Sequence, residues 1–109
     1  MKKKYRLKRN EEISSLVKQN KIKKSKSFIV YYQDNEYDFS RICISVSKKL
    51  GNAVERNKIK RQVREMVKKC FSFQINKDYL IVVRKVYDEH NFQENFLLLK
   101  EVYQKINKI

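Results

Sequence analysis

The sequence contains no proline, no tryptophan, one glycine and one histidine. Flexible linkers between domains are rich in glycine, serine or proline, and no such stretch is found here. A loop that cradles phosphates needs several glycines, so nucleotide-binding loops of that kind are excluded. We therefore expect a single domain over residues 1–109, which is long enough for one hydrophobic core but not for two.

Long apolar runs are also missing, because none exceeds five residues. A membrane-spanning helix needs about 20 apolar residues. The N-terminal segment MKKKYRLKRNEE has no apolar stretch behind its charges, which argues against a signal peptide. We expect a soluble, cytoplasmic protein. Cys43 and Cys70 lack the spacing of a zinc site, and His90 alone cannot complete one, so we expect two reduced thiols.

Positive charge is abundant and unevenly distributed. The chain has 27 Lys and Arg against 12 Asp and Glu. Residues 1–26 carry a net charge of +9 and residues 48–69 carry +7, whereas the remainder is close to neutral. A surface that serves only solubility mixes the two signs. Segregation of this kind is typical of a protein that binds a polyanion such as a nucleic acid.

Hydrophobic periodicity predicts helices and strands that alternate along the chain. The expected elements are a helix capped by Asn10, a basic loop over 21–27, a strand over 28–32, an acidic turn over 33–40, a strand over 41–46, a helix after Asn52, a strand over 79–84 and a helix opened by a capping box of Asn91 and Glu94. This order predicts an α+β fold, a two-layer α-β sandwich with helices packed on a small sheet.

The helix after Asn52 carries the densest positive charge. Asn52 is its expected cap, and Glu55 completes a capping box. At about 100° per residue, one wedge of the helix is apolar and predicts the buried face: Ile59, Val63, Met66, Val67 and Cys70. The adjoining sector, called the basic stripe below, consists of Asn57, Lys60, Arg61, Arg64 and Lys68. Arg56 lies in the first turn, where the helix dipole favours an anion.

Residue chemistry alone leaves two interpretations of the basic stripe open. A run of charges is commonly a solvated helix face, but the planar guanidinium of arginine matches phosphate and favours a nucleic acid. The aromatic residues of the first strand and the following turn also have two interpretations, as core or as platforms for bases: Phe28, Tyr31, Tyr32 and Tyr37. We expect His90 on the surface and the acids of the turn to be solvated: Asp34, Glu36 and Asp38.

Residues 45–65, SVSKKLGNAVERNKIKRQVRE, resemble the signature of the bacterial ribonuclease P protein component. The pattern Arg-Asn-x-x-Lys-Arg-x-x-Arg is met by Arg56, Asn57, Lys60, Arg61 and Arg64. The resemblance extends over nearly the whole chain, from Tyr5-Arg6-Leu7-Lys8 to the last helix. It implies about four strands in a mixed sheet, three helices and a left-handed βαβ crossover, against the usual right-handed rule.

The resemblance also implies a function. Such a protein is the accessory subunit of ribonuclease P and assists endonucleolytic removal of the 5′ leader from precursor tRNA. The catalytic groups and the required magnesium ions lie in the RNA subunit. The implied partners are that RNA and precursor tRNA, with no DNA and no membrane, and no catalytic or metal-binding residue is expected in the protein.

The resemblance assigns two binding surfaces. The residues implied to bind the RNA subunit are Lys48, Lys49, Asn52, Arg56, Asn57, Lys58, Lys60, Arg61, Arg64 and Lys68. A cleft between the first helix and the sheet is implied to receive the leader, on a surface that includes Ile13, Val17, Ile29 and Tyr31. Ile13 replaces a phenylalanine that is common in this family, so it offers an apolar contact instead of a stacking one.

Three other classes of protein fit the sequence less well than this family. A ribosomal or other structural RNA-binding protein shares only the charge argument. An autonomous endonuclease is disfavoured because the sequence shows no acid–base constellation. A DNA-binding helix-turn-helix is disfavoured because a strand, not a helix, precedes the basic helix.

Overall fold

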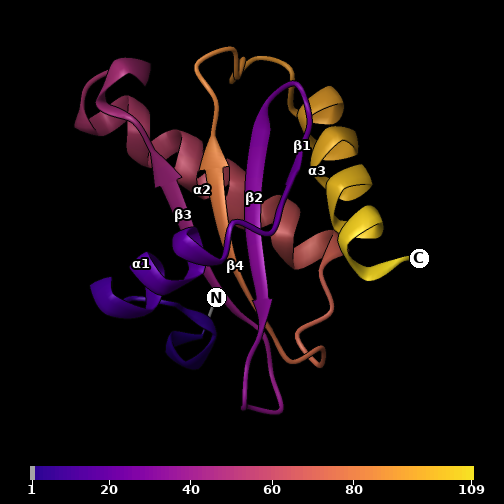
Figure 1. Ribbon diagram of the computed structural model, residues 1–109. Helices are drawn as coiled ribbons and strands as arrows, with labels where there is room; N and C mark the ends of the chain where they lie inside the picture. The colour runs from indigo at the N-terminus through magenta and orange to yellow at the C-terminus, as the bar shows by residue number, and fades with distance from the viewer. Residues whose placement is uncertain (1) are drawn as a thin grey trace.

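The computed structural model describes residues 2–109 and contains three α-helices, two short 3₁₀ helices and four strands (Figure 1). In chain order they are η1 (Lys3–Tyr5), α1 (Asn10–Gln19), β1 (Ile22–Lys24), β2 (Phe28–Asp34), β3 (Arg41–Val46), η2 (Lys48–Leu50), α2 (Ala53–Cys70), β4 (Lys77–Val83) and α3 (Phe92–Asn107). The predicted α+β class is confirmed.

The four strands form one mixed sheet in the order β1-β2-β4-β3. β2 pairs antiparallel with β1 and β4, whereas β3 pairs parallel with β4. The connection between these two parallel strands is α2. In Figure 1 both strands point upward, β4 lies to the right of β3, and α2 passes behind the sheet, so the crossover is left-handed. This implied feature is confirmed, and it departs from the rule that governs nearly all such connections.

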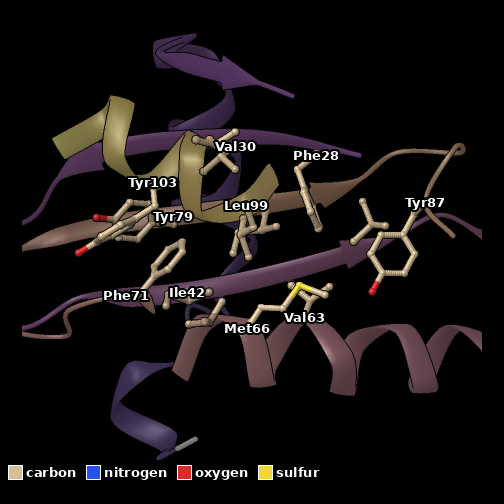
Figure 2. Packing of buried hydrophobic residues seen from close by; sticks show 14 of the residues in the cluster. Phe28, Val30, Ile42, Val63, Met66, Phe71, Tyr79, Tyr87, Leu99 and Tyr103 are labelled. Carbon is tan, nitrogen blue, oxygen red and sulfur yellow. The ribbon is translucent and has the colours of Figure 1, made fainter. Parts of the chain in front are cut away.

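The main hydrophobic core lies between one face of the sheet and the helices α2 and α3. Phe28, Val30 and Tyr79 from the strands pack there against Val63 and Leu99 from the helices (Figure 2). The predicted apolar face of α2 is buried as expected, except that Cys70 is half-buried. Because side chains alternate along a strand, Ile29 and Tyr31 face the opposite side of the sheet.

Helix α1 lies on that opposite side, over a smaller hydrophobic cluster. Leu16 of α1 packs with Leu7 and Leu80, and Ile13 and Tyr31 pack against the edge of this cluster. The sheet and the α2–α3 layer form the predicted sandwich, and α1 covers part of the second face. The rest of that face stays open, which places the candidate leader surface beside α1.

Several local predictions are wrong. The basic loop over 21–27 contains a short strand, β1, because Ile22 and Lys24 pair with Tyr31 and Ile29 of β2. Asn10 is not the cap of α1; it is the first helical residue, and Arg9 occupies the cap position without a side-chain hydrogen bond.

The capping box expected at Asn91 is also absent. Asn91 occupies the cap position, but its side chain makes no cap hydrogen bond to the helix. It donates instead to the Glu94 carboxylate, since the two side chains are close enough to bond each other directly.

Candidate RNA-binding site

The turn that launches α2 depends on the only glycine of the chain. Gly51 has φ of 134° and ψ of −169°, a backbone region that other residues rarely enter. A Cβ built on Gly51 would lie 2.8 Å from Cδ of Glu55. Glu55 is held there by the predicted capping box, because its backbone N–H donates to Asn52 and its carboxylate accepts from the Asn52 N–H. The start of α2 is thereby fixed relative to Lys48 and Lys49.

The structure divides the predicted basic residues of α2 into separate groups. The five stripe residues follow one flank of the helix beside its buried face, and Lys60 and Arg64 among them are half-buried. Asn57, Arg61 and Lys68 are more exposed, and Lys68 lies 4.0 Å from Glu65. Lys58 projects from the opposite flank, where its Nζ lies 3.9 Å from the carboxylate of Glu89. Lys58 is therefore apart from the basic stripe and already has an acidic neighbour.

Arg56 occupies a distinct place in the first turn of α2. Its side chain is half-buried, and its Nε is buried without a hydrogen-bond partner among residues 2–109. An unmade hydrogen bond at a buried charged donor is costly. Among residues 2–109, the fold therefore leaves this donor of Arg56 unsatisfied.

A groove at the outer edge of β3 brings together basic side chains from both positive segments. Arg6 forms an isolated β-bridge with Ile42, and the Leu7 N–H donates to the Ile42 carbonyl at 3.0 Å. This contact sets Arg6 and Lys8 opposite Lys60 and Arg64 of α2. The groove encloses about 200 Å³ and is lined by Arg6, Leu7, Lys8, Ile42, Cys43, Ile44, Lys60 and Arg64.

The charges in this edge groove are not neutralised from within. In the described part of the chain no carboxylate lines it, and none of its four cations takes part in an ion pair. Burial raises the pKa of the Cys43 thiol, while the charge of Lys60 opposes that rise. Four converging cations favour an anion. Sequence reasoning missed Arg6 and Lys8 as site residues, although the +9 charge of residues 1–26 was a signal.

The four predicted leader residues lie on one face of the molecule. Tyr31 of β2 and Ile13 of α1 meet at the smaller hydrophobic cluster. Ile29 lies in the neighbouring row of the sheet, opposite Val82, and is half-buried. Val17 follows Ile13 by one helical turn and is 41% exposed. Cys43 belongs both to this cluster and to the edge groove, so the two surfaces adjoin.

The acidic residues gather at the other end of the sheet. A cavity of about 570 Å³ there is lined by Glu11, Glu12, Ser15, Gln33, Asp34, Asn35, Glu36, Tyr37, Arg41 and Asp78. Arg41 donates to both carboxylate oxygens of buried Asp78, at 2.9 and 2.7 Å, and also to Glu12. Hydrogen bonding to Asp78 raises the pKa of the Arg41 guanidinium, although burial opposes the rise. Within residues 2–109, no three His, Cys, Asp or Glu side chains are placed to hold a metal ion.

Comparison with known proteins decides between the classes. The ribonuclease P family model matches residues 1–107. The chain is 37% identical over 107 residues to the ribonuclease P protein component of Bacillus pumilus, covering 96% of this chain and 90% of the relative. The chain belongs to the ribonuclease P protein family. It is also 44% identical over 87 residues to the ribonuclease P protein component of Mycoplasma capricolum, covering 78% of this chain and 80% of the relative.

Solved structures of ribonuclease P proteins share the fold described above. A mutant of the Staphylococcus aureus protein superposes with a TM-score of 0.85 at 38% identity, covering 97% of this chain and 90% of that one. The function of this family is tRNA 5′ maturation, as a component of an RNA-based processing enzyme. Among the described residues, no helix is long and apolar enough to cross a membrane.

Proposed function

We propose that this ribonuclease P protein binds the catalytic RNA subunit through α2 and holds the 5′ leader of precursor tRNA on the open sheet face. The catalytic groups and the magnesium ions belong to the RNA subunit, and the complex works in the cytoplasm. The observation that carries the proposal is the convergence of cations from two distant segments on one edge of the sheet, where they form no ion pair with any described residue. Within residues 2–109, no three His, Cys, Asp or Glu side chains are placed to hold a metal ion. In this proposal the protein contributes binding and orientation.

The RNA subunit is proposed to dock on the loop before α2 and on one flank of that helix. The residues are Lys48, Lys49, Asn52, Arg56, Asn57, Lys60, Arg61, Arg64 and Lys68, with the smallest contribution from Lys58. The guanidinium of arginine can bind a phosphate in a bidentate manner, through two parallel hydrogen bonds. Arg56 supports this assignment most directly, because its buried Nε lacks an acceptor within the described chain.

The leader is proposed to lie across Ile29 and Tyr31, against the α1 wall formed by Ile13 and Val17. Single-stranded RNA is held without sequence preference by stacking on aromatic side chains and by a basic path for its phosphates. Tyr31 supplies the ring, and the adjoining edge groove supplies cations for the backbone. The groove thus links the leader surface to the helix that docks on the RNA subunit.

A reconstitution assay tests this proposal. The protein should stimulate cleavage of precursor tRNA by a bacterial ribonuclease P RNA at low magnesium concentration, where the RNA alone is slow. Purified protein treated with a ribonuclease, after removal of that nuclease, should cleave nothing alone. Cleavage by the RNA-free protein would instead indicate an autonomous endonuclease.

Substrate affinity tests the leader surface separately. Tyr31→Ala should weaken binding of precursor tRNA to the holoenzyme by about 1–3 kcal/mol, the usual contribution of a stacked base. Affinity for mature tRNA, which has no leader, should stay within twofold of wild type. Equal losses for both ligands would assign Tyr31 a purely structural role.

A further inference from the structure

Arg41 joins three separate parts of the chain through one guanidinium. It lies at the start of β3 and binds Asp78 of β4 through Nε and Nη2. The same Nη2 donates to Glu12, in the first turn of α1. The ring of Tyr37, from the turn between β2 and β3, lies over the guanidinium at 4.5 Å. The Arg41 side chain is 13% exposed and that of Asp78 is 2% exposed, whereas that of Glu12 is 28% exposed, so the Arg41–Asp78 pair is the better shielded from water.

Asp78 is itself held in place by a second partner. The Asn35 amide donates to Asp78 Oδ1 at 2.8 Å and to the Phe39 carbonyl at 3.1 Å. The guanidinium is therefore held in a fixed position by β3, β4 and the turn between β2 and β3. Glu12 is the one member of the cluster that comes from α1.

The ion pair between Glu12 and Arg41 differs in kind from the other contacts that attach α1 to the sheet. Among residues 2–109, it is the one polar side-chain contact between α1 and the sheet. The remaining attachment is apolar and is centred on Leu16, which is fully buried, with Ile13 beside it. An apolar contact is non-directional, so the packing of Leu16 and Ile13 restrains rotation of α1 about its own axis less than a hydrogen bond does. The ion pair between Glu12 and Arg41 adds a directional contact that opposes this rotation.

The roll of α1 decides where its other flank lies. Stepping about 100° per residue, Glu12 is on the side of Leu16 away from Ile13 and Val17. A small rotation about Leu16 moves these two apolar residues toward the sheet or away from it. The leader is proposed to lie over the surface that these two residues form with Tyr31 and Ile29.

We infer that Glu12 and Arg41 are positioning residues that set the α1 wall of the leader surface. This inference rests on the leader surface proposed above. Loss of the ion pair should weaken the contribution of the leader to substrate affinity while leaving the docking of the RNA subunit intact. Among the described residues, none from α2 hydrogen-bonds to Arg41, Asp78 or Glu12, and none lines the cavity beside them.

The test measures leader-dependent affinity in the reconstituted holoenzyme. The readout is the ratio of affinities for precursor tRNA with a five-nucleotide leader and for mature tRNA, measured well below the melting temperature. Glu12→Ala should lower this ratio threefold or more, with RNA-subunit affinity within twofold of wild type. Glu12→Gln keeps an oxygen that accepts from Arg41, so it should lower the ratio less.

Glu11→Ala is the matched control. Glu11 lies in the same helical turn, lines the same cavity and makes no ion pair among the described residues. Glu11→Ala removes the same charge from the same turn and the same favourable interaction with the helix dipole. The ratio of affinities should stay within twofold of wild type. A lowered melting temperature with an unchanged ratio in Glu12→Ala would overturn the inference and leave a purely structural ion pair.

Tyr31→Ala in the same assay separates this inference from the proposed function. If Tyr31→Ala lowers the ratio and Glu12→Ala does not, only the positioning role fails. If neither variant lowers it, the leader surface itself is wrong and the inference fails with it. Equal loss in Glu11→Ala and Glu12→Ala would also overturn the inference, since charge alone would then account for the effect.

Discussion

Gly51 and Glu55 are in contact in a way that leaves no room for a side chain at position 51. A Cβ there would approach Cδ of Glu55 to 2.8 Å and its Oε1 to 2.9 Å. Glu55 cannot move aside without giving up its hydrogen bond to the Asn52 N–H. The glycine and the capping box therefore act together to set the direction in which α2 leaves the loop.

Gly51→Ala should lower the free energy of unfolding by about 1–3 kcal/mol, because the backbone conformation is strained for any residue with a Cβ. Urea denaturation with an unchanged m-value measures the effect. The double variant Gly51→Ala, Glu55→Ala should show a smaller loss than the sum of the two single variants, since part of the clash is relieved. Strict additivity would assign the whole cost to the backbone, and wild-type stability of Gly51→Ala would contradict the prediction.

Arg64→Ala should weaken binding to the RNA subunit by about 1–3 kcal/mol, the usual range for a lost charge-assisted hydrogen bond. The slope of log affinity against log salt should become shallower by about one unit. Lys58→Ala is the matched control, because it removes the same charge from the same helix on the flank where Glu89 lies 3.9 Å away. Similar losses in both variants would mean that total charge, not the position of the stripe, determines binding.

Sulfate should raise the melting temperature of the isolated protein relative to chloride at the same ionic strength. An anion that binds the folded state stabilises it by mass action, and the edge groove collects four cations without a carboxylate among the described residues that line it. Matched ionic strength keeps general screening constant, although sulfate also strengthens apolar burial. The Lys60→Ala, Arg64→Ala variant should therefore keep only a small gain. A gain equal to that of wild type would remove the groove as an anion site.

Cys70 should react slowly with iodoacetamide in the folded protein at neutral pH, because the thiolate is the reactive form. Burial raises the pKa of Cys70 to about 11 from the ordinary value of 9.0, with a smaller opposing effect of Lys100. In a Cys43→Ala variant, the alkylation rate of Cys70 should increase with pH. The midpoint of this increase should lie near the raised pKa in the folded state and near 9.0 in urea. The raised pKa also means that this thiol favours folding below pH 9.0 and that its contribution is lost as the pH rises toward 11. A native midpoint at 9.0 would contradict this.

The parts of the structure that the sequence predicted well are those determined by neighbouring residues. Helix α2 was recognisable because Asn52 and Glu55 mark its start and its apolar residues recur at helical spacing. The resemblance likewise assigned Tyr31 to the leader surface, and the structure has Tyr31 on the sheet face opposite Phe28 and Val30. Strand β1 was missed because three residues, two of them lysines, carry no alternation, and only pairing with β2 makes them a strand.

The parts that could not be predicted depend on contacts between distant segments. Nothing local marks Asp78 as the partner of Arg41, since 37 residues separate them. Arg6 and Lys8 were visible only as members of a charged segment, and the bridge between Arg6 and Ile42 is what brings them to α2. The candidate site is therefore predictable in its composition along α2 and not in its completion by the N-terminus.

The parallel pairing of β3 with β4 has a consequence for how quickly the chain reaches its native state. The whole of α2 separates these two strands in the sequence. Folding slows as the sequence separation of native contacts grows. Residues 48–69, which form η2 and nearly all of α2, carry a net charge of +7 and must come to lie beside the basic residues Arg6 and Lys8 in the native state. We therefore expect counter-anions, RNA phosphates among them, to accelerate refolding and not only to shift its equilibrium.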